Sequence, residues 1–200
     1  LENRIAGLHI LQSANDTPPQ AIEIFGANHS IEDNVIGVDS AGSPVGVCGQ
    51  GIKVSGSGTQ ILDNTIVRSR IGFEGIVPTA ILASDTSPSF GQITVRRNIV
   101  ESGPGRVYAF GPGIPQALQT FAPARITAID GTSVTGGSGA GSPCPGCLID
   151  LYSDDADDVE EALAHLGQAT ADGSGQFAIT LSQPLAPGTG LRTSSTTAAA

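Results

Sequence analysis

The repeating pattern of this chain is clearest in one stretch, Gly51-Ile-Lys-Val-Ser-Gly-Ser-Gly-Thr-Gln-Ile-Leu-Asp-Asn-Thr-Ile66. Ile52 and Val54 are two positions apart, the spacing that places both side chains on one face of a β-strand. Glycine and serine follow, and a second short apolar group then surrounds Asn64. Because neither apolar group is long enough to bury a core by itself, the pattern predicts short strands that are stabilised by stacking on further copies.

The same pattern recurs through the first half of the chain. Four asparagines, each with an aliphatic residue two positions later, follow one another at intervals of 31, 30 and 34 residues: Asn3, Asn34, Asn64 and Asn98. Stacked copies would lie about 4.8 Å apart, with aligned asparagine side chains forming an amide ladder. The repeats therefore predict a parallel β-solenoid, with an antiparallel sandwich of recurrent short strands as the alternative.

The fourth repeat departs from the others in length. Its counterpart of Ile52 and Val54 is the pair Ile81 and Ala83, which lies too far upstream of Asn98. We expect residues 87–91 to form an inserted loop that accounts for the difference.

Residues 21–36 and 51–66 resemble the repeat of right-handed parallel β-helix proteins, whose coils read Gly-Ile-x-Val, a turn, and Ile-x-x-Asn-x-Ile. The resemblance covers about residues 1–105. It implies an all-β fold that starts with a short right-handed parallel β-helix, or solenoid. Polysaccharide lyases and hydrolases, adhesins, passenger domains and large surface proteins all use this fold, so the resemblance indicates architecture more than activity.

The rest of the chain divides into a connector and a second domain. Residues 106–124 are rich in proline and glycine but contain apolar side chains, which predicts a connector or a cap on the solenoid. Residues 125–200 contain six strand-like segments, typical of a small β-sandwich. The turn at 171–175 predicts a hairpin, and residues 159–164 fit either a helical turn or an extended segment.

Two segments of this second domain, residues 148–155 and 165–177, resemble immunoglobulin-like or carboxypeptidase-regulatory-like sandwich modules. Such modules follow β-helix repeats in large bacterial surface and secreted proteins. The resemblance implies a secreted or cell-surface location and a longer parent chain. The absence of methionine and of a signal segment also predicts an excerpt or a processed chain.

Charge excludes some partners. The formal net charge is −10, with −3 over residues 1–119 and −7 over residues 120–200. This excess of acid repels phosphate backbones and anionic lipid surfaces, so we expect no nucleic-acid partner. No apolar stretch approaches the roughly 20 residues of a membrane span.

The strongest cluster of acidic residues lies in the second domain. Six carboxylates occupy eight positions: Asp154, Asp155, Asp157, Asp158, Glu160 and Glu161. Calcium would relieve their repulsion, because it binds six to eight oxygen ligands. The spacing is not that of an EF-hand, and a solvated acidic loop is the alternative.

Cysteines form one close pair. Cys144 and Cys147 are separated by Pro-Gly and come directly before a predicted strand, a context that favours neither a redox centre nor zinc. A short-loop disulfide in an oxidising compartment and a reduced structural pair both stay open. We expect Cys48 to be a buried side chain of the solenoid.

Basic residues on the solenoid suggest a weak glycan site. Lys53, Arg68 and Arg70 could contact an anionic polysaccharide, although a solvated outer face is the simpler and favoured explanation. We predict a non-catalytic structural or adhesive section of a secreted or cell-surface protein, with polysaccharide or cell-surface components as partners. The alternatives are part of a carbohydrate-active β-helix enzyme and a glycan-binding module; the absence of Trp argues against the latter.

Overall fold

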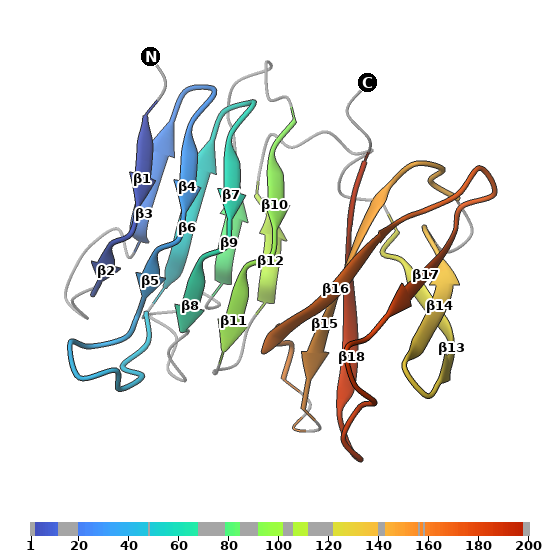
Figure 1. The fold of residues 1–200 in the computed structure, drawn as a ribbon. Coiled ribbons are helices and arrows are strands. Elements are labelled where there is room, and N and C mark those ends of the chain that lie inside the picture. Colours follow the sequence, from blue (N-terminus) through green and yellow to red (C-terminus); the bar gives the residue numbers. More distant parts are fainter. Residues whose placement is uncertain are drawn as a thin grey trace. The chain divides into compact units, whose positions relative to one another are not determined.

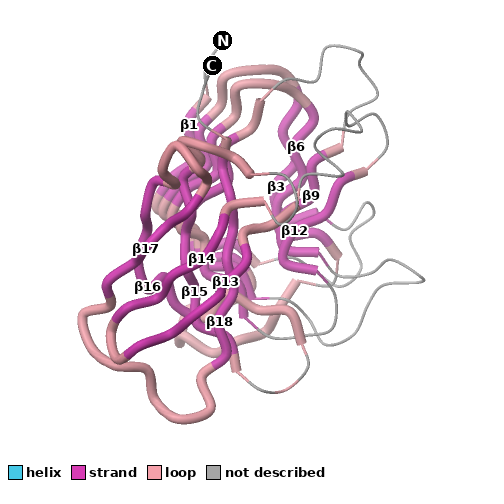
Figure 2. The backbone as a smooth tube through the Cα atoms, turned by 90° about the vertical axis from the view of Figure 1, so that its right-hand side faces the viewer, coloured by secondary structure: helices cyan, strands magenta, loops and turns pink. Residues whose placement is uncertain are grey.

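The computed structural model describes residues 3–11, 20–47, 49–67, 79–84, 92–101, 106–111, 122–139, 143–155, 157 and 159–197. All regular structure in these ranges is β-strand, and Figure 2 draws no helix. No described helix is therefore available to cross a membrane. The chain forms two compact units: Leu1–Gln119 with Asp158–Ala162, and Thr120–Asp157 with Leu163–Ala200. The predicted all-β class is confirmed.

The first unit consists of three parallel sheets of four strands each (Figure 1). The first sheet contains β1 (Arg4–Ala6), β4 (Ser30–Glu32), β7 (Gln60–Leu62) and β10 (Thr94–Arg96). The second contains β2 (His9–Ile10), β5 (Val35–Ile36), β8 (Thr65–Val67) and β11 (Ile99–Glu101). The third contains β3 (Gln20–Phe25), β6 (Gln50–Ser55), β9 (Thr79–Ala83) and β12 (Arg106–Phe110). The chain visits the three sheets in turn, so each circuit is one coil and four coils are stacked.

The register of the coils places identical side chains over one another. Ile31 pairs with Ile61 in the first sheet, and Ile36 pairs with Ile66 in the second. All four side chains are fully buried. Each strand alone is too short to remove such side chains from water, so the stacking of coils supplies the hydrophobic stabilisation.

The register also tests the predicted alignment of repeats. Ile81 pairs with Ile52, as the sequence predicts, and the expected inserted loop at 87–91 lies outside the described residues. The alignment of Asn3 with Asn34 is wrong, because Ile5 pairs with Ile31 and the residue that bonds to Asn34 is Leu8. The first coil is shorter than coils 2 and 3, and the residue that aligns with Asn34 is therefore Leu8, five positions after Asn3.

The third sheet continues past the residue where the sequence resemblance ends. β12 lies within the predicted connector and pairs with β9 through Tyr108 and Ile81. Tyr108 also packs against the buried Ala83. Proline and glycine on either side of this strand conceal it in the sequence.

The second unit is a sandwich of two antiparallel sheets. One contains β13 (Arg125–Asp130), β14 (Ser133–Gly137) and β17 (Gln176–Thr180), and the other contains β16 (Ala164–Thr170), β15 (Leu148–Asp154) and β18 (Gly190–Thr196). Val134, Phe177 and Ile179 of the first sheet share one buried cluster with Ile149 and Leu151 of the second. This shared cluster is the core of the sandwich.

The structure decides between the two alternatives for residues 159–164 and corrects the prediction for the turn at 171–175. Residues 159–164 contain no helix; Ala162 instead forms an isolated bridge with Val100. The turn at 171–175 does not close a hairpin, because β16 and β17 belong to different sheets. Ala171 bonds to Cys147 on one side, while Ser138 bonds to Gly175 on the other, so the turn passes from one sheet to the other.

Candidate functional site

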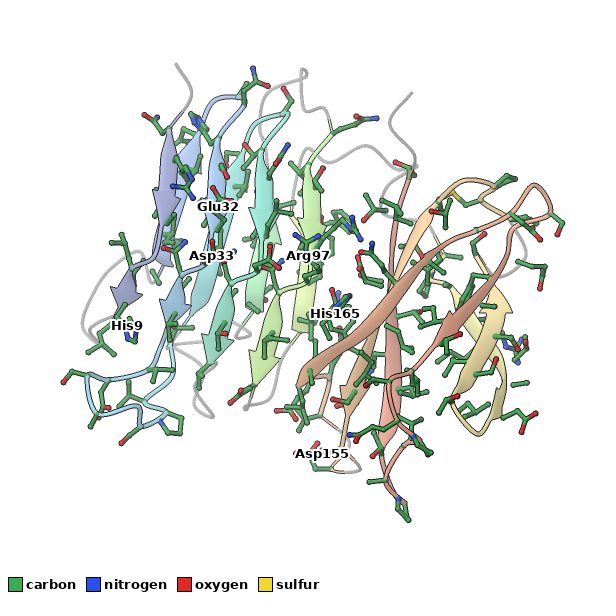
Figure 3. The ribbon with its side chains drawn as sticks, viewed as in Figure 1. His9, Glu32, Asp33, Arg97, Asp155 and His165 are labelled. Atoms are coloured by element: carbon green, nitrogen blue, oxygen red, sulfur yellow. A yellow bond between two sulfur atoms is a disulfide. The ribbon has the colours of Figure 1, made fainter. Side chains whose placement is uncertain are left out.

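The bend between the first and second sheets has the same two-residue form in all four coils. Its first residue has a left-handed backbone, with φ of 66° at Gly7, 56° at Asp33, 56° at Asp63 and 54° at Arg97. This conformation is uncommon for residues other than glycine. It turns the strand sharply into the next sheet, and we call the side chains of Asp33, Asp63 and Arg97, with the neighbouring Glu32, the bend ridge (Figure 3).

A ladder of buried amides fixes the bend from the inside. The Nδ2 atom of Asn34 donates to Oδ1 of Asn64 at 2.9 Å, and Nδ2 of Asn64 donates to Oδ1 of Asn98 at 2.9 Å. The same two oxygens accept the backbone N–H groups of Asn34 and Asn64. Because these polar groups are buried and paired, the predicted ladder is confirmed for these three asparagines.

Two acidic groups of the bend ridge, Glu32 and Asp63, are paired with arginines from neighbouring coils. Arg97 donates to Asp63 from Nε at 2.8 Å and from Nη2 at 2.7 Å. Arg4 of coil 1 donates to Glu32 of coil 2. That hydrogen bond lowers the pKa of Glu32, while the Asp63 carboxylate acts in the opposite direction more weakly. Glu32 is thereby held as a carboxylate at neutral pH.

Asp33 differs from the other carboxylates of the bend ridge. Its side chain is exposed, and no described side chain forms an ion pair with it. It occupies the coil position next to Asp63. Two neighbouring carboxylates of this kind resemble the acid and base of a glycosidase, but such a pair needs one group that can hold a proton near neutral pH. The two hydrogen bonds from Arg97 to Asp63 favour the charged form of that carboxyl, which does not suit the proton donor of such a pair.

The predicted glycan residues do not form a described basic patch. The Nζ atom of Lys53 in β6 lies 2.6 Å from Oε1 of Glu23 in β3, and each side chain is 24% exposed. The positive charge of Lys53 is therefore offset by its neighbour in the preceding coil. Arg68 and Arg70 lie outside the described residues.

The second unit contains a pair between a half-buried histidine and a buried aspartate that the sequence did not predict. Nε2 of His165 in β16 lies 3.0 Å from Oδ1 of Asp150 in β15, and Asp150 is fully buried. The ring of Tyr152 meets the imidazole edge to face, with centroids 5.3 Å apart. A polar residue between Ile149 and Leu151 is the only sequence signal for this pair, and it does not indicate the partner.

The predicted calcium ligands have different surroundings. Asp154 is buried and forms an ion pair with Arg192, whereas Asp155 and Asp157 are exposed. Asp154 and Asp155 bring carboxylate oxygens within 4.8 Å of each other. Asp158 lies outside the described residues, and Glu160 belongs to the segment grouped with the first unit. This arrangement does not decide between the two predicted alternatives, calcium binding and a solvated acidic loop.

The close cysteine pair forms a disulfide. Cys144 and Cys147 are joined, with Cα atoms 5.5 Å apart. Cys147 is fully buried in the sandwich core, directly before β15. Cys48 lies outside the described residues.

Comparison with protein families, curated proteins and solved structures finds no match for this chain.

Proposed function

We propose that this chain is a non-catalytic structural and adhesive section of a longer secreted or cell-surface protein, in which a right-handed parallel β-helix is followed by an immunoglobulin-like sandwich module. Polysaccharide or other cell-surface components are its partners. The observation that carries the proposal is the pairing of charged side chains between coils, because these charges hold neighbouring coils together and are not left for a substrate.

Three ion pairs support this interpretation. Arg4 with Glu32 and Lys53 with Glu23 join coils 1 and 2, while Asp63 with Arg97 joins coils 3 and 4. Opposite charges in register favour one alignment of the coils and disfavour a shifted one. The charged side chains of the bend ridge thus fit a role in fixing the register of the coils better than they fit a catalytic role.

The aromatic residues also favour a structural role over a glycan-binding one. Sugar faces stack on exposed aromatic rings, but the chain has no Trp and only two Tyr. Tyr152 is buried beside His165, and burial against Ala83 raises the pKa of Tyr108. The disulfide between Cys144 and Cys147 supports an oxidising, extracellular location.

Polysaccharide turnover tests the proposal. The full chain is incubated with acidic and neutral polysaccharides, and new reducing ends and unsaturated products are measured. We expect neither, and we expect Asp33→Asn to leave thermal melting unchanged while Asp63→Asn lowers the melting temperature. Product formation that is lost in Asp33→Asn, with unchanged melting, would show a carbohydrate-active enzyme and overturn the proposal.

A pull-down on insoluble polysaccharides separates adhesion through other surfaces from a dedicated glycan site. The matched pair is Lys53→Gln and Glu23→Gln, which remove opposite charges from the same ion pair. If binding is lost with Lys53→Gln and strengthened with Glu23→Gln, the solenoid contains a specific anionic-glycan site, contrary to the structural role.

A further inference from the structure

One end of the coil stack exposes apolar side chains. β1, β2 and β3 are edge strands of their sheets and together form coil 1. Three of the six exposed large apolar side chains in the described residues belong to this coil: Leu8 at 49%, Leu11 at 56% and Phe25 at 68%, the last on the outer face of β3. Ile5 is only half-buried, although its register partner Ile31 is fully buried.

The strands of coil 1 have a described neighbouring strand along only one edge of their backbone. A parallel strand directs alternate peptide groups to its two edges. On the edge that faces coil 2, the carbonyls of Asn3, Leu8 and Ile10 accept hydrogen bonds. No described strand lies on the other edge, and an edge of this kind is a template for a further strand.

At the opposite end of the stack, another segment of the first unit covers part of coil 4. Val100 of β11 in coil 4 donates to the carbonyl of Ala162 at 2.9 Å and accepts from its N–H at 3.0 Å. Val100 is fully buried. The first unit therefore covers part of its coil 4 end with its own residues, and its coil 1 end offers the apolar surface.

Leu8 determines what fits on that surface. In the ladder, each Asn donates its N–H and its Nδ2 group to the Oδ1 atom of the next Asn. Leu8 occupies the ladder position in coil 1, where its N–H donates to Asn34. The Leu8 side chain has no oxygen to accept from a preceding Asn, so an amide placed over it would lose a hydrogen bond and an apolar side chain would not.

We propose that the coil 1 end binds one further parallel coil of the same polypeptide, and that this coil places an apolar residue, not asparagine, over Leu8. We identify the occupant as a coil because the edge strands of coil 1 can form one more parallel strand pairing of the kind that joins the existing coils. Such pairing joins coils 1 and 2, coils 2 and 3, and coils 3 and 4. The inference rests on the proposed role within a longer chain, but its test measures stability and association instead of polysaccharide turnover.

The test adds a coil to the full chain. A second copy of residues 30–58 is fused directly before Asn3, because Asn3 occupies the coil position of Thr59, the residue that natively follows Gly58. Two versions are compared, one with Asn34 retained in the copy and one with Asn34→Leu. A third version with Ile36→Asp in the copy is the control for added length.

We expect the Asn34→Leu copy to raise the melting temperature of the chain by about 5 °C or more, and the Asn34 copy to raise it less. The Ile36→Asp copy leaves it unchanged. When Leu8→Asn is introduced as well, the order reverses, because the ladder then continues through the added coil. An unchanged order, or no stabilisation by either copy, would overturn the proposal.

Sedimentation velocity of the unextended chain tests the competing occupant. We expect a monomer over micromolar concentrations. A dimer that dissociates with Leu8→Lys or Phe25→Lys would identify a second copy as the occupant and contradict the assignment to a preceding coil.

Discussion

Arg97 holds the Asp63 carboxylate with two parallel hydrogen bonds, from Nε to Oδ1 at 2.8 Å and from Nη2 to Oδ2 at 2.7 Å. The two residues occupy the same left-handed position in consecutive coils. A planar guanidinium matches a carboxylate in this way, which a lysine cannot do. The pair therefore reports directly on the alignment of coils 3 and 4.

Asp63→Asn will destabilise the chain modestly. Because both side chains are about one third exposed, solvent screens the pair, and we expect a loss of less than about 1 kcal/mol in the free energy of unfolding. Urea denaturation at low and high salt checks this, since the difference from the wild type should shrink as salt is added. A loss that is large and independent of salt would contradict a surface pair.

Asn64→Leu will destabilise the chain far more, although it changes no charge. The substitution removes the Oδ1 atom that accepts both nitrogens of Asn34, and it removes the Nδ2 donor to Asn98 and to the Ile31 carbonyl. Each buried group left unpaired costs about 1–3 kcal/mol, so we expect a total of at least about 3 kcal/mol. Urea denaturation measures the loss, and Asp33→Asn is the exposed control.

Acid will destabilise the turn at Asp172. A hydrogen bond from the Ser174 hydroxyl, followed by backbone N–H groups, lowers the pKa of Asp172. A carboxyl with a lower pKa in the folded state contributes stability above its unfolded pKa, and that contribution is lost as the pH falls through the folded value. Asp172→Ala should therefore lose less melting temperature on acidification than the wild type. Equal losses would show that the turn is not linked to this carboxylate.

Reduction of the Cys144–Cys147 disulfide will lower the stability of the second unit. Closing a loop of about four residues restricts the unfolded chain by about 2 kcal/mol. Thermal melting with and without a phosphine reductant checks this, in a Cys48→Ser background that removes the third thiol. The double variant Cys144→Ser with Cys147→Ser should not respond to the reductant.

Calcium will leave the melting temperature unchanged. Arg192 already neutralises the buried Asp154, and Asp155 is exposed to water, so a cation gains little by replacing these contacts. Melting in millimolar calcium and in chelator measures the difference. A calcium-dependent rise that disappears in Asp155→Asn would place a metal ion at the acidic run.

The stacked core and the amide ladder were predictable because they repeat. Ile52, Asn64 and their counterparts occur at similar intervals, and a regular interval in sequence becomes a register in space. The predicted alignment of Asn3 was wrong because the connection between the second and third sheets is shorter in coil 1 than in coil 2. Periodicity alone does not reveal the length of a variable connection.

Contacts without a repeat were not predictable. Asp150 and His165 lie on neighbouring strands, but the irregular segment between them hides their pairing. The turn at 171–175 has the residues of a hairpin, but the strands on its two sides, β16 and β17, belong to different sheets of the sandwich. Local sequence rules describe the bend of such a turn but not the sheet that each flank joins.

The two-residue bend between the first and second sheets has a practical consequence for engineering. Its length is constant in every coil, whereas the connections from the second sheet to the third span 9, 13, 11 and 4 residues. The two-residue bends thus keep the coils in the same register, whereas the connections from the second sheet to the third vary in length without changing that register. A foreign peptide grafted into the exposed residues 40–45 of the coil 2 connection should therefore leave the phase of the coils unchanged.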